Sequence, residues 1–460
     1  MSSLRGLLDT ARSALMTHQM ALNVTGHNVA NVDSPGYTRQ RLELGTRPGS
    51  EQRLDGIGAG VEPIALQRLR QETFDRAYRS EAAGLGMAER RDVLLRGVEA
   101  VVGEPGNPGV GVALDEFFSS WADLANEPSE ESYRRAVLES GDRLASRLNQ
   151  LDSQLMAQRR DMNDEVERIA RQVNDKAGRI AELSRRIKAS ELSGQVSADL
   201  RDARDLLVDE LSGLVELRAE EDATGSFRVW VGGRALVDGP QHFALNLEQS
   251  TDARGLVLTH LVWADSGRAF SPDGGELKGV LQVRDEILPA RMAQLDALAA
   301  NLVDQVNALH RQGRDLDGQS GLDFFDVAGR SAAGLRLSAR LQDSPRKLAA
   351  SLDGGVGNGE QAAAIGALAE SGVAALSGRT LPEAWADLVS RSGVDAEKAT
   401  ADLDAQKAFV TELDNRRQSL SGVNLDEELA IMMQQEQAYN AAARVISVAD
   451  GLMQTVLELV

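Results

Sequence analysis

The sequence has no cysteine, few aromatic residues and no long hydrophobic run. Without cysteine, the 460-residue chain forms no disulfide and has neither a thiolate nucleophile nor a Cys-ligated metal site. No stretch reaches the roughly 20 apolar residues that a membrane-spanning helix needs, so we expect no membrane partner. Aromatic residues make up 4% of the chain beside 42% hydrophobic residues, a composition that favours long helices packed through Leu, Ala and Val over deep ligand pockets.

Basic residues are outnumbered, with 50 Lys and Arg against 70 Asp and Glu, which gives a formal net charge of -20. We expect no nucleic-acid partner, because binding to phosphates needs a basic face. The simplest effect of the acidity is solubility and repulsion between free subunits. Residues 1–9 lack a basic segment followed by an unbroken apolar stretch, so we expect no cleaved signal peptide.

Residues that could carry chemistry are scattered. No two histidines are spaced four residues apart, as a helical metal site requires, and no GxSxG motif is present. Most carboxylates stand near Arg or Lys at helical spacing, as surface ion pairs do. We therefore expect no enzyme activity, no cofactor and no metal site. The five histidines are His18, His27, His242, His260 and His310.

Two loops resemble ligand sites. Residues 315–326 place oxygen-bearing side chains at alternate positions, as a calcium loop does, but Ser320 stands where the EF-hand turn needs glycine and Asp326 where it needs glutamate. We expect a structural turn there. The glycine-rich residues 354–359 lack a preceding strand and a following GK[ST], so we expect a linker and no phosphate site.

Both ends of the chain carry a heptad seam, in which apolar or small residues recur at alternating steps of four and three. Such narrow seams need a partner helix, and each terminus is the obvious partner for the other. The pattern fits equally an internal coiled coil that closes a monomer and a strand of a multi-subunit tube. Asn424 and Glu427 predict an N-cap for the last helix. The seam positions are Leu4, Leu8, Ala11, Leu15, His18, Leu22, Thr25, Val29, Ala438, Ala442, Val445, Ala449, Leu452, Val456 and Leu459.

The middle of the chain alternates between long helical patterns and one short β pattern. No proline occurs between Ser129 and Gly239, and apolar residues recur there at helical spacing until about residue 190. Apolar and polar residues then alternate over 227–247, with a turn at Gly232-Gly233. Helical periodicity returns at 287–309 and again at 396–420.

We therefore expect a mainly α fold: terminal helices that form a coiled-coil domain, and a discontinuous long-helix bundle with a small inserted β-rich piece. The predicted boundaries are 1–45 and 421–460 for the terminal coiled coil, 46–219 and 286–420 for the bundle, and 220–285 for the β-rich insertion.

A polar cluster marks the end of the first helix. Asn23, Asn28 and Asn31 are poor helix formers. We expect Asn31 to close the helix in the left-handed region, and Pro35-Gly36 to form the central pair of a type II turn. Capping does not explain Asn23 and Asn28, and their amides offer donors and acceptors for hydrogen bonds to a neighbouring chain. The alternative for Asn28 is a tolerated polar residue on a solvated face.

This segment resembles the N-terminal signature of the flagellar rod, hook and hook-associated proteins, a helix that ends in N-x-x-N followed by P-G-Y. Here Asn28, Asn31 and Pro35-Gly36-Tyr37 carry it. The continuation Thr38-Arg39-Gln40 resembles the hook-associated members more than the rod members. Further stretches resemble that family in the family's order: Phe117-Phe118 to Pro128 with 135–138, Leu200 to Ser212, Asn307 to Phe325, and Ser421 to Glu428.

The resemblance implies an inner coiled-coil domain and self-assembly into a ring or helical layer at the hook-filament junction, outside the cell. It implies contacts with the hook protein and a second hook-associated junction protein, export by the flagellar type III apparatus, and a chaperone on the C-terminal helix. The family's large outer β-domain is expected to be absent, because only a short Ala- and Gly-rich stretch separates Phe325 from Ala401.

The alternatives are another flagellar axial protein, hook or rod, and a secreted helical effector or adhesin. The expected subunit interface is drawn from both terminal helices and the turn that follows the first. Its predicted residues are Leu8, Leu15, Leu22, Asn23, Asn28, Asn31, Tyr37, Arg39, Val445, Leu452, Val456 and Leu459.

Overall fold

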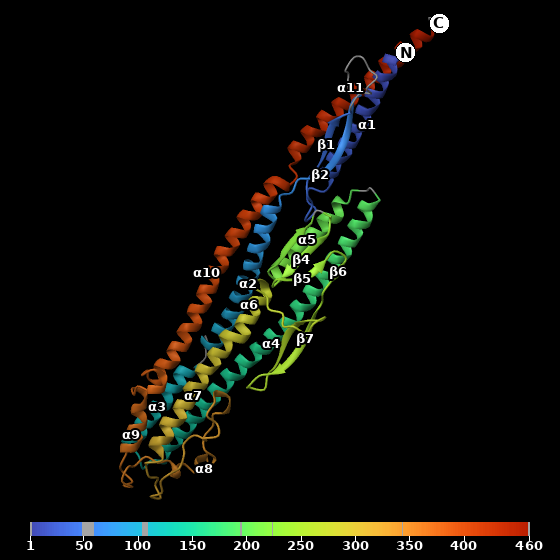
Figure 1. The fold of residues 1–460 in the computed structure, drawn as a ribbon. Helices are drawn as coiled ribbons and strands as arrows, with labels where there is room; N and C mark the ends of the chain where they lie inside the picture. Colours follow the sequence, from blue (N-terminus) through green and yellow to red (C-terminus); the bar gives the residue numbers. More distant parts are fainter. Residues whose placement is uncertain are drawn as a thin grey trace.

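The molecule is long and narrow, with both termini at one end (Figure 1). A computed structural model describes residues 2–47, 59–103, 109–193, 196–222, 224–342 and 344–458. The terminal helices form one end, a bundle of long helices forms the middle, and loops with short helices close the other end (Figure 1). The predicted mainly α fold is confirmed.

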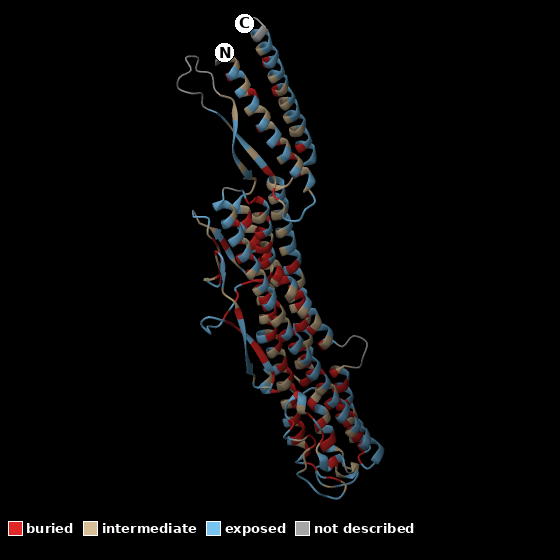
Figure 2. Ribbon diagram, turned by 90° about the vertical axis from the view of Figure 1, so that its right-hand side faces the viewer, coloured by how far each residue is buried: buried red, intermediate tan, exposed pale blue. Residues whose placement is uncertain are grey.

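The bundle is built around α4 (Glu131–Leu192), whose 62 residues span about 93 Å. Its buried side chains recur at steps of three and four, from Leu144 to Ile187, so the helical periodicity of the sequence is confirmed. Figure 2 shows the buried residues running as a stripe along the bundle interior. The other long helices are α2 (Glu72–Gly103), α3 (Val110–Asn126), α5 (Ala198–Leu214), α7 (Leu288–His310) and α10 (Leu381–Ser421).

The helices of the second half begin earlier than predicted. A short helix α6 (Gly275–Gln282) runs through the π-turn Val283–Ile287 into α7. Helix α10 begins at Leu381 instead of Ala396, after a capping box in which the Thr380 hydroxyl accepts from the Glu383 N–H and the Glu383 carboxylate accepts from the Thr380 N–H.

Aromatic side chains fill the end of the bundle that lies away from the termini. Phe117 of α3 lies 5.5 Å from Phe324 and 5.7 Å from Phe325, between ring centroids, and Trp121 lies 5.3 Å from Phe324. The two Phe-Phe pairs, about 200 residues apart in sequence, therefore share one core. The short helices α8 (Ala339–Gln342) and α9 (Glu360–Gly366) lie in the loops at this end.

His310 lies inside this core and gives a pH prediction. Its Nδ1 donates to the Leu322 carbonyl at 2.7 Å, its Nε2 accepts from the Ala349 N–H at 3.0 Å, and burial lowers its pKa to about 4. Unfolding restores an ordinary pKa, so the unfolded chain binds the extra proton between pH 6.5 and 4 and stability falls with acidification. Between pH 7.5 and 5 we expect this histidine to cost about 2 kcal/mol.

Urea denaturation at the two pH values measures this loss. The His310→Gln variant, which cannot titrate, should be less stable than wild type at pH 7.5 but should lose about 2 kcal/mol less on going to pH 5. Equal losses in the two proteins would contradict a neutral buried imidazole.

The predicted β-rich piece forms two small antiparallel sheets beside α4. The first orders β3 (Arg218–Glu221), β4 (Phe227–Val231), β5 (Arg234–Asp238) and β6 (Gln241–His242), and its predicted turn has Gly232 and Gly233 at φ 56° and 77°. The second pairs β7 (Leu245–Thr251) with β8 (Val257–Trp263). The predicted extent of 220–285 is wrong at its end, because the strands stop at Trp263 and α6 begins at Gly275.

A β-hairpin near the N-terminus was not predicted. Strands β1 (Gln40–Thr46) and β2 (Val61–Arg68) pair in antiparallel fashion and lie along α1 (Ser2–Ala30). Their register shifts between Glu43 and Leu44. The prediction that the helical bundle begins at residue 46 is therefore wrong, because helix α2 begins only at Glu72.

The terminal helices α1 and α11 (Leu425–Glu458) pack side by side at the end of the bundle (Figure 1). Asn424 caps α11 as predicted: its Oδ1 accepts from the Asp426 N–H at 3.0 Å. None of the described helices is both long and apolar enough to cross a membrane. In the described part of the chain beyond β8, pairing of β type is limited to isolated bridges, such as Phe325 with Leu337.

Candidate assembly site

The contact between α1 and α11 is narrow and made of small side chains. Ala11 and Thr25 of α1 and Ala442 and Ala449 of α11 are buried, and all four are predicted seam positions. His18, also in the seam, has its Nδ1 2.7 Å from the Gln435 Oε1. The chain thus supplies a partner for each terminal seam, but a contact through alanine and threonine buries little area per helical turn.

Much of the apolar surface of this helix pair stays open. Of the predicted interface residues, Val445, Leu452 and Val456 are exposed by 39%, 50% and 38%, while Leu8, Leu15 and Leu22 are half-buried. Leu459 lies outside the described residues. Such a row of exposed apolar side chains is typical of an interaction surface. Other exposed apolar residues of the pair are Leu7, Met16, Met20, Leu425, Leu429, Met433 and Val448.

Asn28 does not offer its amide to a neighbouring chain. Its Nδ2 donates to the Gln40 carbonyl at 2.8 Å and to the Glu428 carboxylate at 3.0 Å. Its Oδ1 accepts from the Gln40 N–H at 3.0 Å and the Tyr37 hydroxyl at 2.8 Å. The intersubunit hydrogen bond that we predicted for Asn28 is therefore wrong: the amide joins α1, β1 and α11 of one chain, and Asn28 is 1% exposed.

The turn after α1 follows the prediction at the glycine and departs from it at Asn31. The Tyr37 N–H donates to the Ser34 carbonyl at 3.1 Å, and Gly36 has φ 76°, as a type II turn requires. A Cβ added at Gly36 would lie 3.0 Å from the Leu206 Cβ of α5. Asn31 does not adopt a left-handed φ; its Nδ2 donates to the His27 carbonyl, which closes the helix end. Asn23 is exposed.

Arg39 ties this turn to the start of α11. Its Nε donates to the Glu428 carboxylate at 2.7 Å, its Nη1 donates to Glu427 at 2.9 Å, and its backbone N–H donates to the Ser421 carbonyl. Beside it, burial and the nearby carboxylates, Asp199 first among them, raise the pKa of the Tyr37 phenol far above its ordinary value. The Tyr37 hydroxyl therefore keeps its proton and donates a hydrogen bond to the Asn28 Oδ1.

One face of α5 docks the terminal elements onto the bundle. Asp202 accepts from the Thr38 N–H at 3.0 Å and from the Arg68 Nε at 2.9 Å. Asp205 accepts from Arg68 at 2.6 Å and from the Arg70 Nη1 at 2.9 Å. Burial raises the pKa of Asp202. Burial alone would also raise the pKa of Asp205, but Arg70, Arg68 and further arginines lower it to about 2, so Asp205 stays charged.

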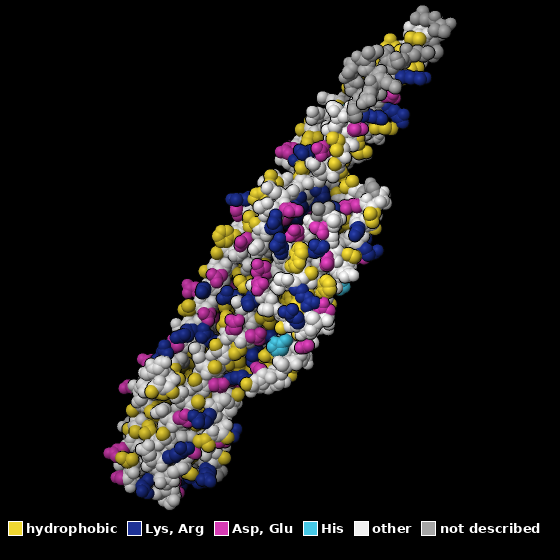
Figure 3. Space-filling view, in the orientation of Figure 1, with side chains coloured by type: hydrophobic (Ala, Val, Ile, Leu, Met, Phe, Trp, Pro, Cys, Tyr) yellow, Lys and Arg dark blue, Asp and Glu magenta, His cyan; other side chains and the backbone are white. Residues whose placement is uncertain are grey.

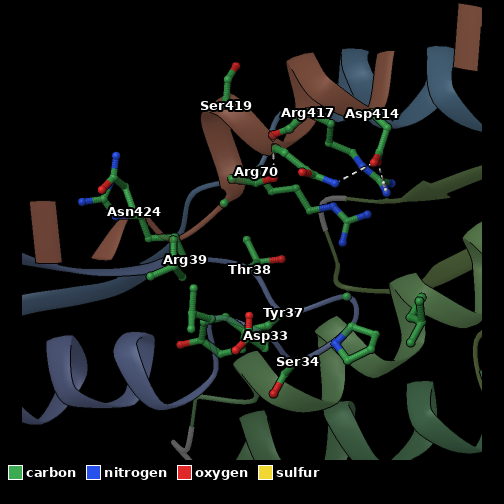
Figure 4. Close-up of a pocket in the computed structure, with 18 of the residues that line it drawn as sticks. Asp33, Ser34, Tyr37, Thr38, Arg39, Arg70, Asp414, Arg417, Ser419 and Asn424 are labelled. Carbon is green, nitrogen blue, oxygen red and sulfur yellow. Dashed lines mark hydrogen bonds and ion pairs between the residues drawn. The ribbon is translucent and has the colours of Figure 1, made fainter. Parts of the chain in front are cut away.

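We call this set the joint: the turn of residues 31–39, Arg68, Arg70, the acidic face of α5 and the link 422–424 between α10 and α11. A cavity of about 540 Å³ lies within it. Figure 4 shows Tyr37, Thr38 and Arg39 on one wall, and Arg70, Arg417 and Asp414 across from them. Its lining carries charges of both signs already paired within the chain, and the described residues contain no cluster of His, Asp and Glu that could hold a metal ion.

The sequence patterns did not predict that Arg68, Arg70 and Gln40 lie at the joint. The available signal was the spacing of Asp199, Asp202, Asp205 and Asp209, which places four acids along one side of a helix and calls for basic partners. The partners lie about 130 residues earlier in sequence, beyond the reach of a local pattern.

Families of flagellar proteins match different parts of this chain. The helical domain of the flagellar hook-associated protein FlgK matches residues 95–325, half of the chain. The chain belongs to the FlgK family. Two further families match the ends: the flagellar basal body rod FlgEFG protein C-terminal region at residues 416–459 and the flagella basal body rod protein at residues 8–38. The rod-type matches thus fall on the terminal helices, and the FlgK match falls on the bundle.

Whole proteins are similar over the same span. Flagellar hook-associated protein 1 of Bacillus subtilis (strain 168) is 27% identical over 98% of this chain and 97% of its own length. The protein of the same name from Salmonella typhimurium is 24% identical over 98% of this chain and 99% of its own length. The structure of the flagellar hook junction protein FlgK from Burkholderia pseudomallei superposes with a TM-score of 0.66 at 18% identity, over 75% of this chain and all of that one.

The stretches of sequence that resemble the flagellar family lie at the joint and in the aromatic core of the bundle. The Leu200 to Ser212 block supplies Asp202 and Asp205 of the acidic face of α5, which hold the joint together. Phe117-Phe118 and Asn307 to Phe325 meet in the aromatic core. Asn307 orders the second of these, since its Oδ1 accepts from the Phe324 and Phe325 N–H groups at 2.9 Å. These blocks therefore maintain internal structure, and the terminal helix pair is the candidate assembly surface.

Proposed function

We propose that the chain is a structural subunit of the bacterial flagellum that forms the junction layer between hook and filament and is needed for filament assembly. The observation that carries this proposal is the FlgK helical-domain match over residues 95–325, combined with a terminal helix pair whose apolar side chains stay exposed. A subunit with such a surface gains stability only when further copies cover it.

The proposed partners of the chain are those that a subunit at this position of the flagellar axis would contact. The terminal pair packs with other copies in a ring or helical layer, and the layer contacts the hook protein on one side and a second hook-associated junction protein on the other. The chain reaches this extracellular place through the flagellar type III apparatus without a cleaved signal peptide, with an export chaperone on the C-terminal helix. The exposed side chains of α11 give such a chaperone a hydrophobic surface to bind.

The proposal includes no catalytic step. The polar cavity at the joint is lined by ion pairs that hold elements of the chain together. His310, the histidine with the most perturbed environment, uses both ring nitrogens to order loops. These groups stabilise the fold.

We also propose an inner domain built from the two ends of the chain and a bundle domain built from its middle. The joint suits such a boundary, because the chain crosses it near residues 69–71 and 422–424, the turn of residues 31–39 lies against it, and the contacts across it are largely polar. The outer β-domain is absent in this proposal. The match to the Salmonella protein runs over 553 residues, against 460 in this chain, so that relative is the longer of the two.

Two alternatives remain. A hook or rod protein would account for the matches at both ends, but the FlgK-type bundle at 95–325 favours the hook-associated class. A secreted helical effector or adhesin would share the export route, but it would not need exposed apolar seams at both ends.

Deletion of residues 425–460 tests the proposal. We expect a chain that keeps the bundle, since the continuous apolar core lies within residues 95–399, but that no longer supports filament growth. Motility and electron microscopy of a strain whose only copy is truncated give the readout, with circular dichroism of the purified chain as the control for folding. Normal filaments on the truncated strain would refute an assembly role for α11.

A further inference from the structure

The sulfur atoms of the chain are concentrated on the terminal helix pair. The chain has no cysteine, so methionine thioethers are its only sulfur groups. Nine of the ten methionines lie in the described residues, and five of these nine lie on α1 and α11, which hold 29 and 34 residues. Any oxidation of sulfur in this chain is therefore oxidation of methionine.

Every exposed methionine in the described part of the chain lies on this pair. The exposed fractions are 55% for Met16, 46% for Met20 and 59% for Met433. In the bundle, Met162 and Met292 are buried. Because exposure governs how readily a sulfur is oxidised, the three exposed thioethers should react with peroxide first. The remaining described methionines are half-buried: Met87, Met156, Met432 and Met453.

The three exposed methionines point away from the contact between the two helices. The His18 Nδ1 lies 2.7 Å from the Gln435 Oε1, so these two residues mark the contact. Met16 and Met20 stand two residues on either side of His18, and Met433 stands two residues before Gln435. Two residues turn a helix by roughly 200°, so all three thioethers lie at one level of the pair and face outward. We call them the methionine set.

The methionine set belongs to the candidate assembly surface and not to the internal contacts of the pair. Figure 3 shows hydrophobic side chains on the surface at the terminal end of the molecule. The buried seam is made of Ala11, Thr25, Ala442 and Ala449, and the joint contains no methionine. A change confined to the methionine set therefore alters the outer surface of the pair and leaves its attachment to the bundle in place.

We propose that the methionine set is an oxidation site that controls assembly. Peroxide converts its thioethers to sulfoxides, and the oxidised chain stays folded but no longer packs with its neighbours. In each reaction one oxygen atom of hydrogen peroxide bonds to the sulfur, which is oxidised, while the O–O bond breaks and the peroxide is reduced to water. The sulfoxide is polar, so its burial between subunits is unfavourable. This inference rests on the proposed self-assembly and adds a regulation of the same surface.

Limited treatment of the purified full chain with hydrogen peroxide tests the proposal. Catalase removes the excess peroxide, and the chain is then sedimented with hook-basal bodies from a strain that lacks it. Peptide mass spectrometry should find sulfoxide in the methionine set and none at Met162 or Met292. We expect unchanged hydrogen exchange in α1 and α11, and about tenfold less chain in the pellet than without peroxide. Methionine sulfoxide reductases should restore the lost sedimentation.

Two variants assign the effect to the methionine set. In the Met16→Leu, Met20→Leu, Met433→Leu chain, leucine is apolar and is not oxidised, so peroxide should cause no loss relative to the same variant untreated. In Met162→Leu, which replaces a buried methionine, peroxide should cause the same loss as in wild type. If the triple variant does not sediment before treatment, the reductases decide: recovery of the oxidised wild type supports the proposal, and no recovery overturns it.

Three results would overturn the proposal and leave the junction role intact. Full sedimentation of a chain oxidised throughout the methionine set would show that the sulfoxides do not block assembly. An equal loss in the triple variant would place the effect on other groups. Faster exchange in α1 and α11 after oxidation would mean that oxidation loosens the fold. Failure of the untreated wild-type chain to sediment with the hooks would refute the junction role and this inference together.

Discussion

Replacing Asn28 by alanine should loosen the terminal helix pair and stop filament assembly. The substitution removes four hydrogen bonds and leaves the Gln40 backbone groups, the Glu428 carboxylate and the Tyr37 hydroxyl short of partners in a buried site. Each unsatisfied buried group costs about 1 to 3 kcal/mol, which exceeds the helix-propensity gain of up to about 0.7 kcal/mol. We expect a net loss of roughly 2 to 4 kcal/mol in the local stability of α1 and α11.

Hydrogen exchange of the purified chain measures that loss directly. The amides of α1 and α11 should exchange faster in Asn28→Ala, while those of α4 keep their protection. Asn23→Ala is the matched control: Asn23 lies on the same helix and is exposed, so its replacement should be neutral or slightly stabilising. Equal exchange in the two variants would show that the Asn28 network does not hold the helix pair.

Asp205→Ala should give the second large effect, a loss of about 3 to 5 kcal/mol in the free energy of unfolding. Asp205 is buried and accepts from Arg68 and Arg70, with the buried Arg79 at 4.0 Å, so its removal leaves one buried and two half-buried arginines without their shared acid. Urea denaturation measures the loss. Asp175→Asn, which removes an exposed pair with Arg179, should cost about 0.5 kcal/mol or less. Similar losses in the two variants would mean that the joint is not held by its buried charges.

The pKa of Asp205 fixes the pH range of this stabilisation. Its folded pKa of about 2 lies below the ordinary value of 3.8, so the folded state favours the charged form. The stabilisation is present above about pH 4 and is lost as the pH falls through 2. The joint should therefore withstand mild acid, whereas His310 already destabilises the far end of the bundle below pH 6.5.

Local sequence patterns predicted the elements whose periodicity, turn or capping residues can be recognised within a continuous stretch of sequence. The helical periodicity of α4 and α7, the glycine turn between β4 and β5 and the cap at Asn424 all follow from spacing over a few turns. The hairpin of β1 and β2 was not predicted, for two reasons. A register shift at Glu43 and Leu44 breaks its alternation of apolar and polar residues, and Pro63 stands inside β2. Helix α6 was not predicted, because its eight residues are too few to show a helical periodicity of apolar residues.

The function of Asn28 could not be read from its neighbours in sequence. Its partner Glu428 is 400 residues away, and the amide is satisfied only when α1, β1 and α11 meet. A polar residue in a helix is equally compatible with a solvated face, an intersubunit bond or an internal network, and only the tertiary structure distinguishes them. The predicted interface residues of α11 remain available for assembly, because Val445, Leu452 and Val456 are exposed.

Electron cryomicroscopy of hook-basal bodies from a strain with the wild-type gene and a strain without it tests the central claim most directly. The account predicts an added protein layer at the distal end of the hook that holds this chain, and its loss, together with the filament, in the deletion strain. Intact filaments on hooks from the deletion strain, or distal hook ends that do not differ between the two strains, would contradict it.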